Sequence, residues 1–504
     1  MIEAIGKATG FVPYQQSIAA IGSVAVYLGK RGVEKRLCLV WEKRAVPTWL
    51  SSFCGERFAA TAEGKQYEAL CGYLDHTNAV GLRKQLPWAG PRVIGLATSV
   101  GLGDRLGIAT PAHVRAVRGT GLRPFFAQQS IREMQRTGRT PEEVMDTATW
   151  GVFQEGWQEG FGSDADHLKT TEDIDATVAA GFTMFTIDPG DHVDNAAQTD
   201  DIATLAAKFD ALPWRDLETD VGDMQRRCFD RSITLPDGTV ITFDRDTILR
   251  AAAKYGKALA HTARMYRHVA SEMSASGGFE LEMSVDETAT PTSVAEHAFV
   301  AGELGRMGVK WVSLAPRFIG EFEKGVDYIG DLDAFRRSFA QHVAVAQHYG
   351  PYKISIHSGS DKFSIYPIAA ALSGGLVHLK TAGTSYLEAL RAIARIDPAL
   401  FREIMAFAIE RYPEDRASYH VSAVLAKVPA PASLLDDALP GILDQHDTRE
   451  TLHVTFGSVL RAEVEGKPRF RDRLMIALAE HEEVHYETVR AHLERHVKPF
   501  VSKK

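Results

Sequence analysis

FELEMSVDETATPTSVAEHAFVAGELGRMGVKWVSLAP, residues 279–316, is the stretch that decides the fold. An apolar, β-rich run opens it, the amphipathic pattern of a helix follows, and a second apolar run closes it, which predicts a βα unit and the next strand. Eight such runs occur along the chain: RVIGLA (92–97), RPFFAQQS (123–130), EGFGSD (159–164), FTMFTID (182–188), FELEMSVDE (279–287), KWVSLAP (310–316), YKISIHSG (352–359) and LVHLKTAG (376–383). Because eight units close a (β/α)8 barrel of about 250 residues, we predict this α/β fold. A doubly wound open sheet is the alternative, since spacing alone does not prove closure.

The 504 residues leave room for additions to the barrel. We expect an N-terminal mixed α/β region at 1–89, the catalytic barrel at 90–395 and a helical C-terminal region at 396–504. An insertion at about 196–277 follows the fourth run and would form a lid, a helical cap or an oligomer contact. Within it, ITLPDGTVITFD (233–244) predicts a hairpin that turns at Asp237–Gly238.

Bulk properties exclude several classes of function. The net charge of −8 gives no basic footprint for nucleic acid and no polybasic membrane anchor. The first residues lack the pattern of a secretory signal, and no apolar run reaches the ~18 residues of a membrane span. The four cysteines show no CxxC spacing and indicate reduced thiols, so we expect a cytoplasmic protein: Cys38, Cys54, Cys71 and Cys228.

Two motifs resemble known sites without the context that those sites need. His481–His485 reads HExxH, the pattern of zinc peptidases, but only 19 residues follow it and no further metal-ligand motif continues it. We therefore expect His481 and His485 to be surface or interface residues with no catalytic part. Gly101–Gly107 reads GxGxxxG, one residue too long for a dinucleotide loop, which argues against NAD.

Polar side chains gather at the carboxyl ends of the runs, the edge where barrel active sites form. They are Gln128, Ser130, Asp164, Asp166, His167, Asp188, Asp191, His192, Glu282, Asp286, Glu287, Arg317, Glu321, Glu323, His357, Ser358, Asp361, Lys362, His378 and Lys380. Imidazoles together with carboxylates suit a divalent cation such as Zn, Mn, Ni, Co or Fe, with coordination positions left open for a substrate.

Six blocks of the sequence resemble those of the tagaturonate/fructuronate epimerase family. They are GLGDRLGIATPAH (101–113), GFGSDADHLKT (160–170), VSLAPRFIGEFEKGVDYIGD (312–331), IHSGSDKFSIYP (356–367), HLKTAGTSYLEALR (378–391) and DTRETLHVTFGSVL (447–460). The resemblance implies a metal-dependent isomerase of hexuronate catabolism that inverts C4 of a 2-keto-hexuronate. Some relatives act on the neutral ketohexoses tagatose and fructose. The expected partner is thus a sugar acid or ketohexose, and a homo-oligomer is compatible with the sequence.

The same resemblance implies roles for individual residues. His167 and His357 would be metal ligands, with Glu323 as the third ligand and His378 as its rival. Asp166 would be the proton acceptor.

Glu282, with Glu287 behind it, would be the opposing proton donor. Arg317, Lys362 and Lys380 are the candidates for binding the substrate carboxylate, and arginine is the better bidentate clamp. The full set assigned to substrate binding is Gln128, Ser130, Arg317, Ser358, Asp361, Lys362, His378 and Lys380.

The chemistry of C4 inversion limits the mechanism. The C4 hydrogen of a 2-ketose is not adjacent to the carbonyl, so its removal gains no enolate resonance. Transient oxidation needs a nicotinamide, whereas retro-aldol cleavage of C3–C4 needs a Lewis acid and an acid/base pair. We therefore expect the retro-aldol route. A class II aldolase or ketose isomerase would use the same groups, and a sugar-acid sensor would use the pocket without a metal.

Overall fold

A closed barrel of eight parallel strands forms the centre of the fold. The computed structural model describes residues 1–44 and 46–501. Around the barrel the strands follow one another in sequence order, which confirms a (β/α)8 barrel and excludes the open sheet. The strands are β7 (Ser99–Leu102), β8 (Arg123–Ser130), β9 (Gly162–Leu168), β10 (Met184–Ile187), β13 (Glu280–Ser284), β14 (Ser313–Ala315), β15 (Lys353–Ile356) and β16 (Val377–Thr381).

Two strands lie later in the sequence than predicted. The first was expected at 92–97, but β7 begins at Ser99. The backbone N–H groups of Ile94 and Gly95 donate to the Glu280 carboxylate, at 3.0 and 2.6 Å, so this apolar segment is held by a side chain and not by a strand partner. The third was expected at 159–164, but β9 runs to Leu168 and includes the polar residues that were expected to follow it.

The segment between β10 and β13 supplies a barrel helix as well as an excursion. Its last element, α9 (Arg245–Glu272), contacts β10, α6 (Thr171–Ala179) and α10 (Val294–Arg306). Ahead of it lie α7 (Ile202–Asp210), α8 (Val221–Cys228) and the antiparallel pair β11 (Arg231–Thr234) and β12 (Val240–Phe243). This pair confirms the predicted hairpin, and Gly238 has a φ of 86° in its turn.

The chain divides into two compact units. One comprises residues 93–101, 164–381 and 498–501, and it contains β10 to β16 with α11 (Leu332–Tyr349) and α12 (Tyr366–Leu372). The other comprises residues 1–92, 102–163 and 382–497. No helix in the described residues has the length and apolarity of a membrane span.

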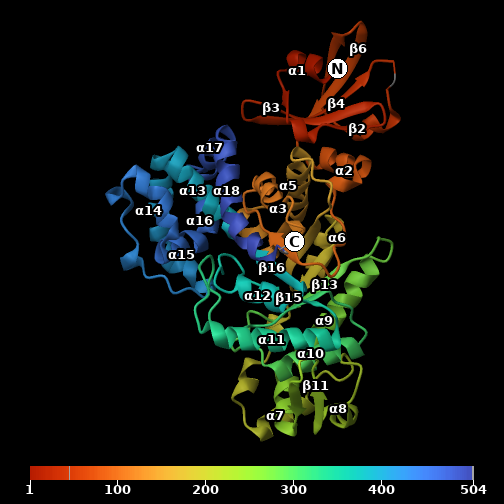
Figure 1. Ribbon diagram of the computed structural model, residues 1–504, viewed down its shortest axis with the longest axis vertical. Helices are drawn as coiled ribbons and strands as arrows, with labels where there is room; N and C mark the ends of the chain where they lie inside the picture. Colours follow the sequence, from red (N-terminus) through yellow and green to blue (C-terminus); the bar gives the residue numbers. More distant parts are fainter. Residues whose placement is uncertain (45, 502–504) are drawn as a thin grey trace. The chain divides into compact units, whose positions relative to one another are not determined.

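An antiparallel sheet of six strands occupies the start of the second of these units, drawn in red in Figure 1. Its main order is β1-β3-β4-β6-β5, and β2 pairs with β3. The two-residue turn between β3 and β4 places Gly32 at a φ of 60°, as tight hairpins require. The strands are β1 (Val12–Pro13), β2 (Ala19–Ile21), β3 (Val24–Arg31), β4 (Glu34–Glu42), β5 (Glu56–Ala62) and β6 (Lys65–Gly72).

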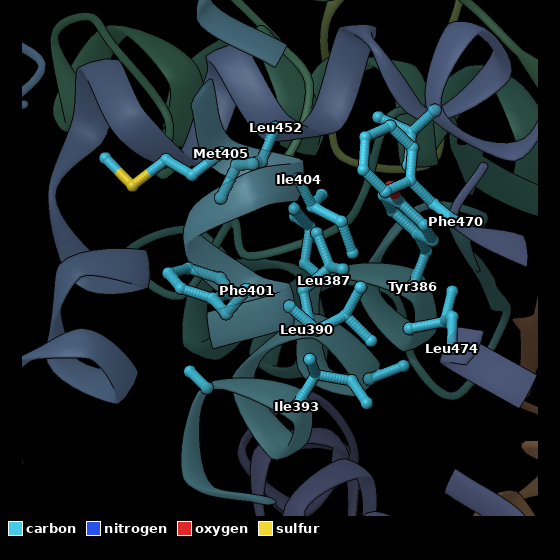
Figure 2. Close-up of a cluster of buried hydrophobic side chains, with 14 of the residues drawn as sticks. Tyr386, Leu387, Leu390, Ile393, Phe401, Ile404, Met405, Leu452, Phe470 and Leu474 are labelled. Carbon is cyan, nitrogen blue, oxygen red and sulfur yellow. The ribbon is translucent and has the colours of Figure 1, made fainter. Parts of the chain in front are cut away.

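The C-terminal residues of the same unit are helical and have their own core. Leu387, Leu390 and Ile393, one face of α13, pack with Phe401 and Ile404 of α14 (Figure 2). Each fully buried side chain of this size contributes about 1.5–3 kcal/mol. The helices are α13 (Thr384–Ile396), α14 (Pro398–Asp415), α15 (His446–Val454), α16 (Phe456–Arg461), α17 (Arg471–Glu480) and α18 (Glu482–Val497).

A break between α17 and α18 divides the HExxH motif. His481 ends α17 with a non-helical ψ of 40°, and His485 lies in the first turns of α18. The two histidines therefore do not share a helix face as a zinc peptidase requires. Both were expected to be surface or interface residues; His481 is exposed, whereas His485 is 1% exposed and lies buried within the chain. It belongs to the buried face of α18 that contains Val489 and Leu493.

Candidate active site

A β-bulge in β9 aims two neighbouring side chains at one place. Between the pairs Phe185↔Ala165 and Ile187↔Leu168, β9 holds one residue more than β10. The extra residue is accommodated at His167, whose φ of 53° lies in the left-handed region. In a regular strand neighbouring side chains point to opposite faces. Here Asp166 and His167 lie in one group of potential metal ligands with His357, all within 4.8 Å of one another.

Each of the two histidines is held by a carboxylate on one ring nitrogen. His167 Nδ1 lies 3.1 Å from Asp188 Oδ2, and His357 Nδ1 lies 3.3 Å from Asp286 Oδ1. The ring centroids are 5.1 Å apart. A carboxylate on Nδ1 orients each ring, as it does around metal-bound histidines. On the other ring nitrogen, His167 Nε2 lies 3.9 Å from Asp166 Oδ1 and His357 Nε2 lies 2.6 Å from Glu282 Oε1. Two imidazoles and the Asp166 carboxylate are a donor set that fits a divalent cation.

The charges of this group are strongly coupled. Burial alone would lower the pKa of both imidazoles, but the carboxylates around them raise the pKa of His167 to about 10 and that of His357 to about 9. Burial alone would raise the pKa of Asp166, yet the Lys380 ammonium and the imidazoles hold it below its ordinary value. The site thus concentrates negative charge, which favours a cation.

Lys380 connects the carboxylates beneath the histidines. Its Nζ lies 2.8 Å from Asp164 Oδ2, from Asp166 Oδ1 and from Glu282 Oε1. The side chain is 3% exposed. The three carboxylates hold the pKa of Lys380 well above its ordinary value despite burial, so the ammonium stays charged. Lys380 is therefore committed to the acidic residues of the barrel interior.

Glu282 is positioned by the strand register. Thr186 of β10, Glu282 of β13 and Ser313 of β14 are direct partners across three adjacent strands. Glu282 Oε2 accepts a hydrogen bond from the Ser313 hydroxyl, and Oε1 lies 2.6 Å from His357 Nε2. Burial would raise the pKa of Glu282, but Lys380 and His357 hold it well below the ordinary value. Glu282 is thus an ionised, fully buried carboxylate in direct contact with a candidate ligand.

Comparison with known proteins identifies the family. A family model described as UxaE, tagaturonate epimerase, matches residues 14–500. The tagaturonate/fructuronate epimerase of Thermotoga maritima is 45% identical over 488 residues, which cover 97% of this chain and 96% of that protein. The chain belongs to the tagaturonate epimerase family. Within the isomerases it is an epimerase, as the sequence blocks predicted.

Solved structures of the family share the whole fold. The native fructuronate-tagaturonate epimerase of Cohnella laeviribosi is 36% identical and covers 99% of this chain and 98% of its own, with a TM-score of 0.91. A glycerol complex of the same protein covers the same shares with a TM-score of 0.90.

Several residues that were assigned to substrate binding in this epimerase have structural partners. The buried Lys362 ammonium donates to the backbone carbonyls of Glu323, Ser360 and Val326. Lys362 therefore holds the loop after β14 in place.

Backbone geometry and exposure distinguish three others. Ser358 and Asp361 have left-handed φ values of 48° and 63°, and the Ser358 hydroxyl accepts a hydrogen bond from Lys324 at 2.6 Å. Arg317 donates to the Thr288 carbonyl and its side chain is 25% exposed. Of the three cations proposed for the substrate carboxylate, Arg317 is the one that reaches the surface.

The two residues predicted as third ligand, His378 and Glu323, are not in the group of described residues that contains His167 and His357. His378 is fully buried and its Nδ1 lies 2.8 Å from the Ser99 hydroxyl. Glu323 is 4% exposed, and within the described chain its carboxylate is not among the atoms grouped with His167 and His357. The group contains Asp166 in that place.

Two predicted residues belong to β8, in the other compact unit. Gln128 is 1% exposed and Ser130 is 4% exposed. The Ser130 hydroxyl accepts from the Glu133 N–H at 3.2 Å and caps α4 (Ile131–Thr137). A capping serine of this kind stabilises its helix by about 1 kcal/mol.

The roles of Asp188 and Asp286 were missed by sequence reasoning. Both follow strands and were noted as polar residues at strand ends, but residue spacing does not show that each contacts the Nδ1 of a histidine. Three hydroxyl groups that donate to carboxylates of the site were missed as well, because a single hydroxyl in an apolar run carries no motif. They are those of Thr186, which donates to Asp164, Ser284, which donates to Asp286, and Ser313, which donates to Glu282.

Proposed function

We propose that this chain interconverts D-tagaturonate and D-fructuronate by inversion at C4, in a reaction that depends on a divalent metal. The names of the Thermotoga and Cohnella relatives support the substrates. The observation that carries the metal dependence is the convergence of Asp166, His167 and His357, with a carboxylate on each Nδ1. Nitrogen and carboxylate ligands suit Zn, Mn, Ni, Co or Fe.

The residues of the chain fit retro-aldol and aldol chemistry. A bound divalent cation supplies Lewis-acid polarisation of a carbonyl oxygen, worth several kcal/mol. Asp166, ionised at neutral pH, takes the proton of the C4 hydroxyl as C3–C4 breaks. After the aldehyde has rotated, Glu282 is the second carboxyl group that takes part, through its contact with Lys380. The Lys380 ammonium lies 2.8 Å from an oxygen of each carboxylate, so it can give a proton to one and accept one from the other.

Arg317 is the group that we assign to the substrate carboxylate. Its guanidinium is partly exposed, two residues beyond the carboxyl end of β14, and it forms a long ion pair of 3.8 Å with Glu321. A guanidinium binds a carboxylate through two parallel hydrogen bonds. Arg317→Met should therefore raise KM for tagaturonate while it changes KM for the neutral tagatose much less. An equal effect on both substrates would exclude this role.

Metal content and turnover of His167→Ala and His357→Ala test the proposal. Each variant should lose the metal and nearly all activity on tagaturonate while it remains folded. His348→Ala is the matched control, because this exposed histidine lies on α11 in the same compact unit. A variant of either ligand with wild-type metal content and turnover would contradict the assignment.

The fate of the C4 hydrogen tests the route. In retro-aldol chemistry this hydrogen stays on carbon, so product formed in D₂O should carry no deuterium at C4. Release of three-carbon fragments without a C4 epimer would indicate an aldolase instead. Deuterium at C4 would exclude the retro-aldol route.

A further inference from the structure

Two cysteines face each other in the N-terminal sheet. Cys38 of β4 and Cys71 of β6 are direct partners in the antiparallel register. Their Sγ atoms are 3.1 Å apart. Two non-bonded carbon atoms pack at ~3.5–4.0 Å, and sulfur is larger than carbon, so this contact is unusually close. Cys38 is 0% exposed and Cys71 is 1% exposed. Both are reduced in the structure.

The strand geometry suits a covalent link between them. Directly opposed residues of antiparallel strands have Cα atoms about 4.5 or 5.5 Å apart, depending on the type of pair. Both values fall within the ~4.4–6.8 Å that disulfides span. The sulfur atoms would need to approach by about 1 Å to reach the ~2.05 Å bond, a movement that side-chain rotation can supply.

The surroundings of the pair favour ionisation of one thiol. Either sulfur can donate the hydrogen bond between them. The Arg36 guanidinium acts to lower the pKa of both thiols. Thiolate is the reactive form of cysteine. Either sulfur can therefore start the reaction.

We propose that Cys38 and Cys71 form a site of reversible oxidation, at which a disulfide joins β4 to β6. The oxidant is a peroxide, because burial excludes larger molecules. One of the two sulfurs gives two electrons to the peroxide O–O bond, which breaks, and the products are a sulfenic acid and water. The other sulfur then attacks the sulfenic sulfur, its proton leaves with the departing hydroxyl as water, and the S–S bond forms.

The disulfide would restrain one hairpin of the sheet. The bond would close a loop of residues 38–71. This loop contains all of β5, an edge strand of the sheet, and most of β6. Closing a loop of this length removes conformations from the unfolded chain. Oxidised protein should therefore melt several degrees above reduced protein, and dithiothreitol should reverse the difference.

Peptide mapping tests the proposal directly. Native protein is treated with hydrogen peroxide, quenched with catalase, alkylated and digested without reduction. A parallel sample is unfolded in urea and refolded with reduced and oxidised glutathione, so that burial does not limit access. Mass spectrometry should find Cys38 linked to Cys71 with the loss of two hydrogens, while Cys54 and Cys228 are alkylated.

Variants separate the pair from general oxidation. Cys38→Ala and Cys71→Ala should each abolish the link and the rise in Tm. The double variant Cys54→Ser/Cys228→Ser should keep both, and it tests the pair even if the single alanine variants fail to fold. Alkylation of Cys38 and Cys71 after both treatments would overturn the proposal, as would links that involve Cys54 or Cys228 equally. None of these readouts depends on the proposed epimerase activity.

Discussion

Replacement of Lys380 by methionine should lower the stability of the protein, and the size of the loss should depend on pH. Lys380→Met keeps the length of the side chain but leaves Asp164, Asp166 and Glu282 without the ammonium that lies 2.8 Å from each. Removal of one partner from a buried ion pair costs about 3–5 kcal/mol. At ~2–4 °C per kcal/mol for a cooperative unit of 150–250 residues, the Tm at pH 7 should fall by about 6–20 °C.

The pH dependence of this loss distinguishes the mechanism. Asp164 already has a pKa of about 6 with the lysine present, above that of the unfolded chain, and loss of the Lys380 ammonium raises it further. Between pH 8 and 5 the folded variant then binds more protons than the unfolded one, so its stability rises as the pH falls. Differential scanning fluorimetry from pH 5 to 8 measures this recovery.

Lys362→Met is the matched control. Lys362 is as deeply buried as Lys380, but its ammonium donates to three backbone carbonyls, which do not titrate. This variant should also be destabilised, without the recovery at low pH. If Lys380→Met is as stable as wild type at pH 7, or if its pH profile parallels that of Lys362→Met, the account of the carboxylate cluster is wrong.

Three further predictions concern single side chains. At saturating metal, Asp166→Asn should lose a factor of roughly 10² to 10⁴ in turnover, the usual share of general acid–base catalysis; wild-type kcat would rule out Asp166 as the base. Burial lowers the pKa of His342 from 6.5 to about 4. As the pH falls from 6.5 to 4, the unfolded chain therefore binds a proton that the folded protein does not, and up to about 3 kcal/mol of stability is lost. Thermal unfolding of His342→Gln should fall less steeply with acid, whereas the exposed His348→Gln should follow wild type. His485→Gln should lower Tm and His481→Gln should not, with turnover of both within about threefold, under ~0.7 kcal/mol of barrier; loss of activity in folded protein would revive the HExxH motif.

The sequence predicted the barrel because the number of strands and the periodicity of the helices can be derived from local sequence patterns, without knowledge of tertiary contacts. It also placed His167 and His357 at the ends of two strands, and the structure brings these rings to 5.1 Å. Strand boundaries were less predictable. RVIGLA has the composition of a strand, but the backbone N–H groups of its Ile94 and Gly95 donate to Glu280, a contact across almost two hundred residues.

The surroundings of the ligands could not be derived from residue types. Lys380 comes from β16 and its carboxylates from β9 and β13, so their meeting depends on barrel closure and strand tilt. A lysine at a strand end is as compatible with a substrate carboxylate as with a buried ion pair. The bulge at His167 has no sequence signature either, since no glycine marks the left-handed position.

Because of that bulge, the site depends on how many residues β9 contains as well as on which residues they are. With the extra residue, Asp166 and His167 face the interior of the barrel while Leu168 stays in the apolar layer, where it is fully buried. Asp166 and His167 are the two residues between Ala165 and Leu168, opposite the single residue Thr186, so a regular strand has room for one of them and not for both. A design that transfers this site to another barrel would thus have to include the extra residue of the bulge, since the same two neighbouring residues on a regular strand would point in opposite directions.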